Sequence, residues 1–312
     1  MLAGLAAAAG AGGSSDFGGG GGSPLVGLNP ADDAVVYPLE EGRALVATVD
    51  FFPPVVDDPA DYGAIAAANA LSDVYAMGGD VAFALAISGF PAVVPSAVVA
   101  EVNRAAAQLV ASCGGAVLGG HSIRCAEPVF GLCVMGFVHP QRIWRKAGAQ
   151  AGDVLMLSKP LGTGLLLSAR REEWLPQAIR TMREPNRTSA KQLQTLAVPP
   201  NAVTDITGYG LLGHAGEMAE RSGVTLRLNA ACLPVLPGVL EVAAAGVRTS
   251  AHRTAKGSAH DIDLVTLAIL QDPQTSGGLL ASVLPEAVAP LVAAGWTRVG
   301  EVVTGDGSVI VG

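Results

Sequence analysis

The stretch from Thr48 to Gly79, TVDFFPPVVDDPADYGAIAAANALSDVYAMGG, decides how the first half of the chain is organised. It begins at the end of an apolar run rich in valine and phenylalanine, which is typical of a strand. From Ala60 onward alanine dominates, and apolar positions recur at helical spacing. The run stops at Gly78 and Gly79, and glycine commonly terminates a helix. We therefore predict a strand followed by a helix.

The segments around this stretch alternate between strand and helix patterns. Strands are predicted for DAVVYPL and RALVATVDFF, joined by an EEG turn, and for DVAFALAISGF, AVLGGHS and VFGLCVMGFVH. A second helix is predicted for VPSAVVAEVNRAAAQLVASCGG, starting near Pro95 and Ser96. The resulting β-β-α-β-α-β-β run ends near residue 145, which is the size of one compact α/β domain.

The second half of the chain contains its own strands and helices. KPLGTG predicts a tight turn before a helix, and AVTDITGYGLLGHAGEMAERSG predicts a loop leading into a helix. Further strands are expected around 277–284 and 298–311. We predict an α/β chain with an N-terminal domain at 25–148 and a C-terminal domain at 149–312. Residues 1–24, which are rich in glycine and alanine, bury too little surface to fold, so we predict a flexible tail there.

The composition excludes two classes of partner. The chain has 312 residues, a net charge of −8 and a pI near 5.1, whereas nucleic-acid binding needs a basic face. Half of the residues are hydrophobic, but no stretch has the 18 or more consecutive apolar residues of a spanning helix. The N-terminus lacks the basic segment of a signal peptide, and none of the four cysteines forms a CxxC pair. We therefore expect a cytoplasmic protein that binds neither nucleic acid nor membrane.

Acidic side chains stand beside small residues in several separate segments. Asp32 and Asp33 open a predicted strand, Asp50 ends the next one, and Asp73 follows Asn69 by one helical turn. Mg²⁺ prefers carboxylate oxygens, and glycine-rich turns offer N–H groups to phosphate. The combination favours a site for metal and phosphate, although each aspartate alone is compatible with a turn cap or a solvated helical position.

Two later segments fit the same chemistry. GGHS leaves a predicted strand at Gly119 to Ser122, and TDITGYGLLGH places Asp205 and Thr207 before two glycines. His121 and His214, taken singly, are equally compatible with structural roles. KPLGTG matches neither a phosphate-binding Walker loop nor a complete dinucleotide fingerprint.

Taken in order, these motifs and the C-terminal DPQTSGGLL segment resemble the selenophosphate synthetase (selenide, water dikinase) family. The resemblance runs from about residue 27 to the C-terminus and is carried most specifically by VDFF…VDDP, TDITGYGLLGH and DPQTSGG. ADDAVVY and SDVYAMGG are shared with the wider aminoimidazole ribonucleotide synthetase-like superfamily, which includes thiamine-monophosphate kinase and a hydrogenase-maturation protein.

The resemblance implies a fold, a reaction and partners. The fold is a two-domain α/β (α+β) arrangement of the aminoimidazole ribonucleotide synthetase-like type. Its β-rich N-terminal domain forms a homodimer, and ATP and Mg²⁺ lie in a cleft at that interface. The family reaction converts ATP, selenide and water into selenophosphate, AMP and phosphate.

The resemblance also implies roles for individual residues. The metal ligands are Asp33, Asp73 and Asp205. Asn69 orients a phosphate or a bound water, Thr207 is a further candidate, and the DPQTSGG loop (272–278) is a signature of the C-terminal domain. The residues implied to line the ATP site are Pro30, Ala31, Asp32, Asp50, Asp73, Gly120, His121 and Ser122.

The chain departs from the family pattern at its N-terminal end. The family opens with a GCGCK-like segment, whose thiol or selenol is thought to handle selenide and whose lysine contacts ATP phosphates. The residues before Val26 contain neither cysteine nor lysine, so no catalytic residue is assigned. The open alternatives are a different native start, a replacement by Cys125, a nucleotide-binding paralogue that does not make selenophosphate, and another ATP-dependent phosphotransferase of the superfamily.

Overall fold

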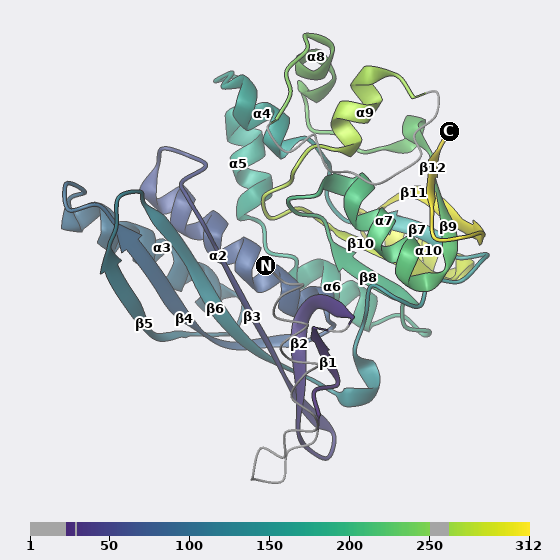
Figure 1. The fold of residues 1–312 in the computed structure, drawn as a ribbon, viewed down its shortest axis with the longest axis horizontal. Helices are drawn as coiled ribbons and strands as arrows, with labels where there is room; N and C mark the ends of the chain where they lie inside the picture. The colour runs from purple at the N-terminus through teal and green to yellow at the C-terminus, as the bar shows by residue number, and fades with distance from the viewer. Residues whose placement is uncertain (1–22, 29, 250–261) are drawn as a thin grey trace.

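Two six-stranded sheets with helices packed on them make up the computed structural model, which describes residues 23–28, 30–249 and 262–312 (Figure 1). The predicted α/β fold class is confirmed. The tail predicted for residues 1–24 lies almost wholly outside the described residues. None of the helices in the described ranges has the length and apolarity needed to cross a bilayer.

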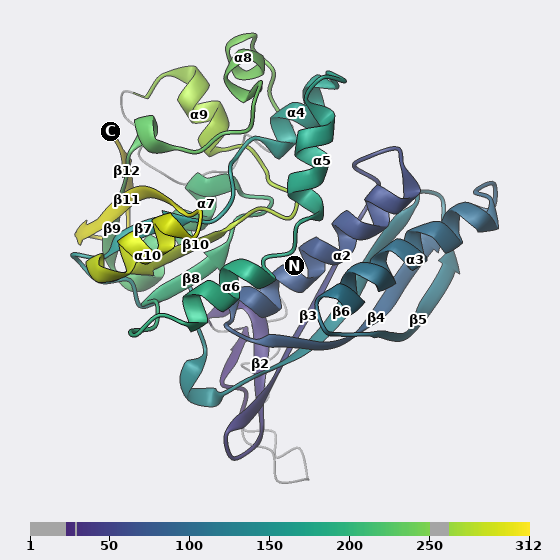
Figure 2. The same cartoon turned by 180° about the vertical axis from the view of Figure 1, so that it is seen from behind.

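The first sheet follows the predicted β-β-α-β-α-β-β run, with one short additional strand at its start. Neighbouring strands are antiparallel except β4 and β5, which are parallel. Helices α2 (Pro59–Ala76) and α3 (Ser96–Ser112) cover one face of this sheet (Figure 2). In spatial order its strands are β1 (Val26–Leu28), β2 (Ala31–Glu40), β3 (Arg43–Phe52), β6 (Val129–Val138), β4 (Asp80–Phe90) and β5 (Val117–Arg124).

Helix α2 is the element that both halves of the molecule share. Asp58 caps its start by accepting a hydrogen bond from the Asp61 N–H at 2.9 Å, and Gly78 follows its end with a φ of 77°. Because alanine dominates its surface, neighbours approach closely: a Cβ on Gly63 would lie 2.1 Å from the Val102 carbonyl oxygen of α3. The helix also contacts α5, α6 and β8 of the second half, so its side chains reach both sheets.

The second sheet is antiparallel apart from the β9–β12 pair. In spatial order its strands are β12 (Val309–Val311), β9 (Val224–Leu228), β11 (Thr297–Thr304), β7 (Val154–Leu157), β10 (Leu279–Val283) and β8 (Ala202–Asp205). Its helices are α4 (Thr163–Ala169), α5 (Leu175–Arg183), α6 (Arg187–Gln194), α7 (Gly210–Ser222), α8 (Val239–Ala244), α9 (Leu264–Leu270) and α10 (Val288–Ala293).

Strand β8 corrects one prediction. The residues before TGYGLLGH were predicted to be a loop, but Ala202–Asp205 pair with β10 as an edge strand. All four residues are buried, so the polar-apolar alternation that marks a half-exposed strand is absent. The strand ends at Asp205, and this end points toward α2.

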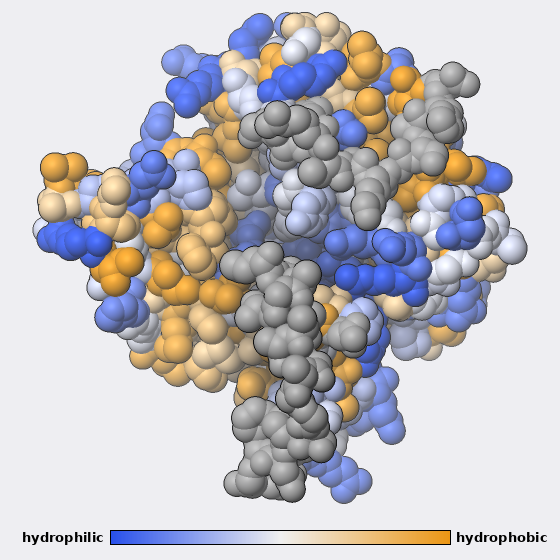
Figure 3. Space-filling view, in the orientation of Figure 1, coloured by the Kyte–Doolittle hydropathy of each residue, from blue (hydrophilic) through white to orange (hydrophobic). Residues whose placement is uncertain are grey.

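The face of the first sheet opposite α2 and α3 is apolar, and none of the described residues covers it. Val49 and Phe51 of β3 are 52% and 53% exposed, and Leu85 of β4 is 37% exposed. Figure 3 shows apolar side chains gathered over these strands. Side chains alternate between the two faces of a strand, so Thr48 and Asp50 of β3 lie on the other face, toward α2. The polar residues of this part of β3 therefore point to the interior.

Candidate functional site

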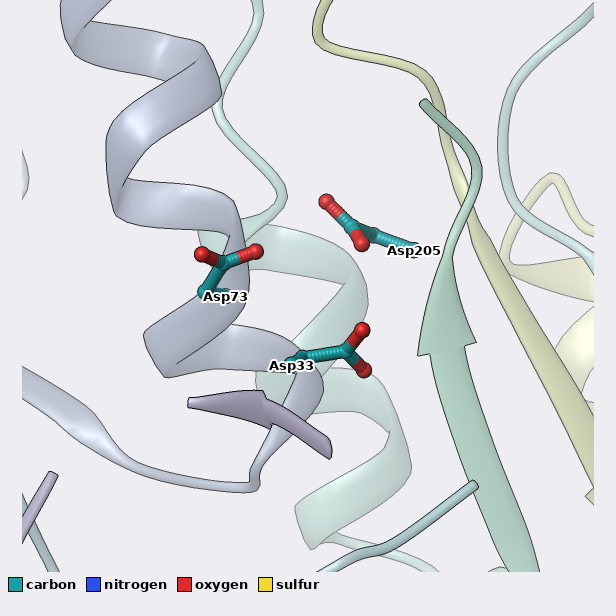
Figure 4. A group of neighbouring side chains, drawn as sticks. All are labelled: Asp33, Asp73 and Asp205. Carbon is teal, nitrogen blue, oxygen red and sulfur yellow. The ribbon is translucent and has the colours of Figure 1, made fainter. Parts of the chain in front are cut away.

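Three aspartates from distant parts of the sequence meet where the two halves join. Asp33 lies in β2, Asp73 lies in α2, and Asp205 ends β8. One carboxylate oxygen from each lies within 4.8 Å of the others, and Figure 4 shows the three carboxylates directed toward one another. These are the residues that the sequence analysis named as metal ligands, and the fold brings them together.

The aspartate cluster (Asp33, Asp73 and Asp205) has fewer hydrogen-bond donors than its oxygens need. Thr204 Oγ1 donates to Asp33 Oδ1 at 3.2 Å, and Thr48 Oγ1 donates to Asp73 Oδ2. Asp33 Oδ2 and Asp205 Oδ2 are buried and accept no hydrogen bond from any described residue. A buried acceptor without a partner is costly, and cation ligation is one way in which proteins compensate it.

Burial and mutual repulsion disfavour the charged forms of this cluster. Burial raises the pKa of Asp33 to about 8; Lys146 opposes the rise, while Asp205 and Asp32 add to it. Burial also raises the pKa of Asp73 well above its usual range, with Asp205 as the largest charged contributor. Both shifts have the physical causes expected for like charges held together away from water.

Lys146 supplies the one ammonium group that contacts the aspartate cluster within the described part of the chain. Its Nζ lies 2.8 Å from Asp33 Oδ1 and 3.0 Å from Glu217 Oε2 of α7. Burial alone would lower the pKa of Lys146, but the two carboxylates outweigh this effect and hold it above its ordinary value. Lys146 and Glu217 were not predicted, because Lys146 meets Asp33, and Glu217 meets Lys146, only through the fold, and no motif marks either residue.

Asp50 is a fourth acid beside the aspartate cluster. Asn69 Nδ2 donates to Asp50 Oδ2 at 2.6 Å, a contact between β3 and α2 that was not predicted from the sequence. Burial and the charge of Asp205 raise the pKa of Asp50 to about 6, while the Asn69 hydrogen bond lowers it. Four carboxylates therefore converge here. Lys146, which contacts one of them, Asp33, also contacts Glu217.

The residues around Asp32 make local contacts. The Asp32 carboxylate accepts hydrogen bonds from the backbone N–H of Asp33 at 2.9 Å and of Lys146 at 3.2 Å. Arg221 of α7 donates to the Ala31 carbonyl oxygen, and Pro30 is exposed. Asp32 thus holds the start of β2 against the chain entering the second half, which places Asp33 in the cluster.

The GGHS segment lies elsewhere in the chain. Gly120, His121 and Ser122 belong to β5 and are exposed, whereas Asp33 belongs to β2. Strands β3, β6 and β4 separate these two strands in the sheet. Within one copy of the chain, the fold therefore does not bring the segment to the aspartate cluster.

Thr207 follows Asp205 and is held by a histidine that the sequence analysis left without a role. The Thr207 backbone N–H donates to His214 Nε2 at 3.1 Å, and its carbonyl oxygen accepts from the Gln274 N–H at 3.0 Å. Burial lowers the pKa of His214, which keeps Nε2 free to accept. The spacing in TDITGYGLLGH thus reflects a turn in which His214, the last residue of the motif, accepts a hydrogen bond from Thr207 near its start.

The donor set of the aspartate cluster fits a hard divalent cation. Mg²⁺ binds through one or two carboxylates together with waters and substrate phosphates, and all the ligand atoms gathered here are oxygens. Two of those oxygens are buried and find no hydrogen-bond donor in the part of the chain that the structure describes, and the surplus of negative charge is what a dication neutralises. The arrangement lacks the sulfur and nitrogen ligands that favour zinc.

Comparisons with known proteins identify the family and the fold of the chain. Residues 31–138 match the model of the AIR synthase related protein N-terminal domain, and residues 150–312 match that of the C-terminal domain. The solved structure of AaThiL complexed with AMPPCP and TMP is similar in fold, with a TM-score of 0.72 at 21% identity. That similarity covers 90% of this chain and 87% of AaThiL.

Relatives at higher identity carry one name. The selenide, water dikinase of Burkholderia pseudomallei (strain K96243) is 48% identical over 284 residues, which cover 86% of this chain and 79% of the relative. The selenide, water dikinase of Caldanaerobacter subterraneus subsp. tengcongensis is 45% identical over 273 residues, which cover 84% and 78% of the two chains. The identity spans both halves of the molecule.

Proposed function

The chain belongs to the selenide, water dikinase family within the AIR synthase related proteins, and we propose on that premise that it makes selenophosphate, AMP and phosphate from ATP, selenide and water. The proposed site is the aspartate cluster with Asp50 and Asn69 beside it. The reaction is an ATP-dependent phosphoryl transfer, and the proposed cofactor is Mg²⁺.

The convergence of Asp33, Asp73 and Asp205 is the observation that carries this proposal. The three carboxylates come from both halves of the molecule and lie within 4.8 Å of one another. Holding them so close costs free energy through repulsion and lost hydration. A site for a cation explains the arrangement, because Mg²⁺, when bound, neutralises charge on the transferred phosphoryl group.

The residues of this chain have separate tasks in the proposed reaction. Asp33, Asp73 and Asp205 would hold the metal, and Lys146 keeps Asp33 oriented through its 2.8 Å contact. Asp50 would bind on the nucleotide side of the cluster, and Asn69 donates a hydrogen bond to it at 2.6 Å. Because the chemistry needs alignment and charge neutralisation more than covalent help, positioning is the main contribution that these residues make.

A homodimer would bring the remaining nucleotide-site residues into play. The described residues leave an apolar face of the first sheet open, with Val49, Phe51 and Leu85 exposed, and this face supports pairing between two copies. In such a pair, Gly120 to Ser122 of one copy would approach the acids of the other. This accounts for the distance between β5 and the aspartate cluster within one chain.

We also propose the division of labour between the two units. Residues 25–148 would form the dimerisation and ATP/metal-binding domain, and residues 149–312 would supply Asp205 and Thr207 from the other side. A cytoplasmic location is part of the same proposal, since the family's substrates ATP and selenide are small and polar.

The proposal is tested by measuring nucleotide products with and without selenide. We expect AMP and phosphate to form from Mg²⁺-ATP only when selenide is present, with selenophosphate detected by ³¹P NMR. Thiamine monophosphate and aminoimidazole precursors serve as the competing substrates. Turnover of one of these in place of selenide would assign the chain to another phosphotransferase of the superfamily, and binding of ATP with no turnover on any substrate would indicate a regulator.

The dimer is tested separately. Phe51→Asp introduces a charge on the apolar face and points away from the aspartate cluster, so it should shift the protein from dimer to monomer in analytical ultracentrifugation. An unmodified chain that sediments as a monomer at micromolar concentration would contradict the dimer without touching the proposed chemistry.

A further inference from the structure

The DPQTSGG loop (Asp272 to Gly278) is buried between the two halves of the molecule. Asp272 and Ser276 have no solvent exposure, and Gln274 is 3% exposed. The loop follows α9 and leads into β10, which pairs with β8 beside Asp205. The family assignment gives this loop no task, so its contacts are the guide to one.

One end of the loop is fastened to the start of α4. Gln274 Oε1 accepts hydrogen bonds from the N–H groups of Gly162 at 3.0 Å and Thr163 at 3.1 Å. Asp272 Oδ2 accepts from the Gly164 N–H at 3.1 Å. These bonds satisfy amides at the helix N-terminus and tie the loop to the KPLGTG turn.

The other end of the loop reaches the nucleotide-side acid through an unbroken chain of hydrogen bonds. The Ser276 N–H donates to Asn69 Oδ1 at 2.8 Å, and Asn69 Nδ2 donates to Asp50 Oδ2 at 2.6 Å. Both contacts fix the same orientation of the Asn69 amide. A residue of the second half thereby sets the position of an acid on β3 of the first half.

Lys159 holds Ser276 from the opposite side. Its buried Nζ donates to the Ser276 carbonyl oxygen at 2.8 Å and to the Glu184 carbonyl oxygen at 2.5 Å. Burying an ammonium group against two carbonyls costs free energy, so packing alone does not explain a lysine at this position. Its two hydrogen bonds join the DPQTSGG loop, at Ser276, to the backbone of Glu184, the residue that follows α5.

The backbone of the loop is constrained where these contacts meet. Ser276 has a φ of 51°, which is unfavourable for a residue other than glycine. Next to it, a Cβ on Gly277 would lie 2.0 Å from the Ile206 carbonyl oxygen, and the Gly278 carbonyl oxygen accepts from the Ile206 N–H at 2.9 Å. The loop is therefore pressed against the residue that follows Asp205.

We propose that Lys159, Ser276 and Asn69 form a positioning relay that holds Asp50 in place for the metal-bound nucleotide. The relay rests on the proposed function, because it assigns Asp50 to the nucleotide side of the metal site. Lys159 fixes the Ser276 peptide, the Ser276 N–H orients the Asn69 amide, and Asn69 fixes Asp50. Through this relay the DPQTSGG loop of the second half sets the position of Asp50, which belongs to the first half.

The relay is tested with Lys159→Met and Asn69→Ala by isothermal titration with AMPPCP, in Mg²⁺ and in EDTA. Outer partners of metal sites typically change metal-linked affinity by about 10- to 100-fold, so we expect the Mg²⁺-dependent Kd to rise about tenfold in both variants. Affinity in EDTA should stay unchanged. Arg183→Met is the matched control, because it removes a different contact between the halves, the 2.6 Å ion pair with Asp61.

A double-mutant cycle distinguishes an effect transmitted through Asp50 from a general loss of structure in the variants. In an Asp50→Asn background, Lys159→Met and Asn69→Ala should cause no further loss, since the relay then has nothing to position. Equal losses with and without the Asp50 carboxylate would overturn the relay. If Lys159→Met does not fold, Asn69→Ala carries the same test.

Failure of the relay and failure of the proposed function give different results. If the unmodified chain binds Mg²⁺-AMPPCP but both variants bind it within twofold of the unmodified chain, the relay is wrong and the proposed function stands. If the unmodified chain does not bind Mg²⁺-AMPPCP, the proposed function fails and the relay fails with it.

Discussion

Asp205 and Asp153 are both 2% exposed, and both belong to the second half of the molecule, yet their surroundings are opposite. Asp153 accepts hydrogen bonds from the Gln150 N–H at 2.9 Å and from Ser282 Oγ at 2.6 Å, and Asn201 Nδ2 contacts both of its oxygens at 2.9 Å. Asp205 has a buried oxygen with no donor among the described residues and faces two other carboxylates.

The difference shows what burial of an acid means in each place. Around Asp153 the hydrogen-bond donors are neutral groups. Through them Asp153 links the turn that precedes β7 with Ser282 of β10 and with Asn201, which lies just before β8. Around Asp205 the neighbours add negative charge, so repulsion makes the fold less stable at that point, and a bound cation would offset it. Burial alone does not separate a structural acid from a functional one, whereas the partners do.

The largest effect is expected from Asp205→Asn. The change keeps the shape of the side chain but removes a negative metal ligand, so kcat/KM for Mg²⁺-ATP should fall about 100- to 1,000-fold. Thermal stability should hold or rise, because one of the mutually repelling charges is gone. Selenide-dependent AMP formation and the melting temperature, measured on the same preparation, check both parts. Asp33→Asn should lower kcat/KM to a similar extent, but its melting temperature should not rise, because the change also removes the 2.8 Å ion pair with buried Lys146.

Asp57→Asn is the control for that prediction. Asp57 is exposed in the VVDDP turn and lies outside the aspartate cluster, so its activity should stay within about twofold of the unmodified chain. Equal losses at Asp57 and Asp205 would show that the cluster is not the metal site.

Asp153→Ala should reverse the pattern. Removing this acid leaves buried donors on Asn201 and Ser282 without their acceptor, so the free energy of unfolding should fall by about 2–4 kcal/mol. The activity per folded molecule should change little. Denaturant unfolding followed by activity at a temperature well below the midpoint measures the two quantities. A stable variant with lost activity would erase the distinction drawn between Asp153 and Asp205.

The aspartate cluster was predicted from the sequence more fully than the groups that hold it. Asp33, Asp73 and Asp205 stand in motifs that the chain shares with its family, so the family resemblance implies them as metal ligands. Lys146 and Glu217 have no such mark, because their role arises from contacts that only the fold creates. Lys146 is 113 positions from Asp33 in the sequence, and Glu217 is 71 positions from Lys146.

 In the sequence Lys146 stands far from Asp33, and only the 2.8 Å contact of the folded chain joins the two side chains. Such pairs cannot be read from local patterns.

Strand order limited the prediction in a second way. The predicted elements of the first half are present, but the place of β5 at the far edge of its sheet depends on its parallel pairing with β4. Local sequence patterns report strand propensity and burial, and they do not report which strands are neighbours. The GGHS segment was therefore predicted as part of the site without any indication that it lies across the sheet from Asp33.

A third prediction concerns the charge of the aspartate cluster. Burial raises the pKa of Asp33 from 3.8 to about 8, and that of Asp73 well above its usual range. Between about pH 4 and pH 8 the folded chain therefore holds more protons on these groups than the unfolded chain, so stability falls as pH rises. In EDTA we expect the melting temperature to decrease across this window.

Addition of Mg²⁺ should restore the lost stability. A ligand at about one hundred times its Kd adds about 2.7 kcal/mol, and the gain should be larger near pH 8 than near pH 6 because ionised carboxylates bind the metal. Asp33→Asn should flatten the pH dependence measured in EDTA and reduce the Mg²⁺ effect, while Asp153→Ala should leave the Mg²⁺ effect intact. A melting temperature that rises with pH in EDTA would contradict the assigned pKa shifts.

The smallest effect is expected at an acid that is neither buried nor clustered. Asp58 caps α2 by accepting the Asp61 N–H at 2.9 Å, and removing a cap of this kind costs about 1 kcal/mol. Asp58→Ala should therefore lower the free energy of unfolding by about that amount, while Asp58→Asn, which keeps a capping oxygen, should lower it by less. Because α2 carries Asp73, a large loss of Mg²⁺-dependent nucleotide affinity in Asp58→Ala would mean that fraying at the first turn reaches the cluster. Unchanged affinity would show that the packing of α2 between the two halves, and not its cap, holds Asp73 in position.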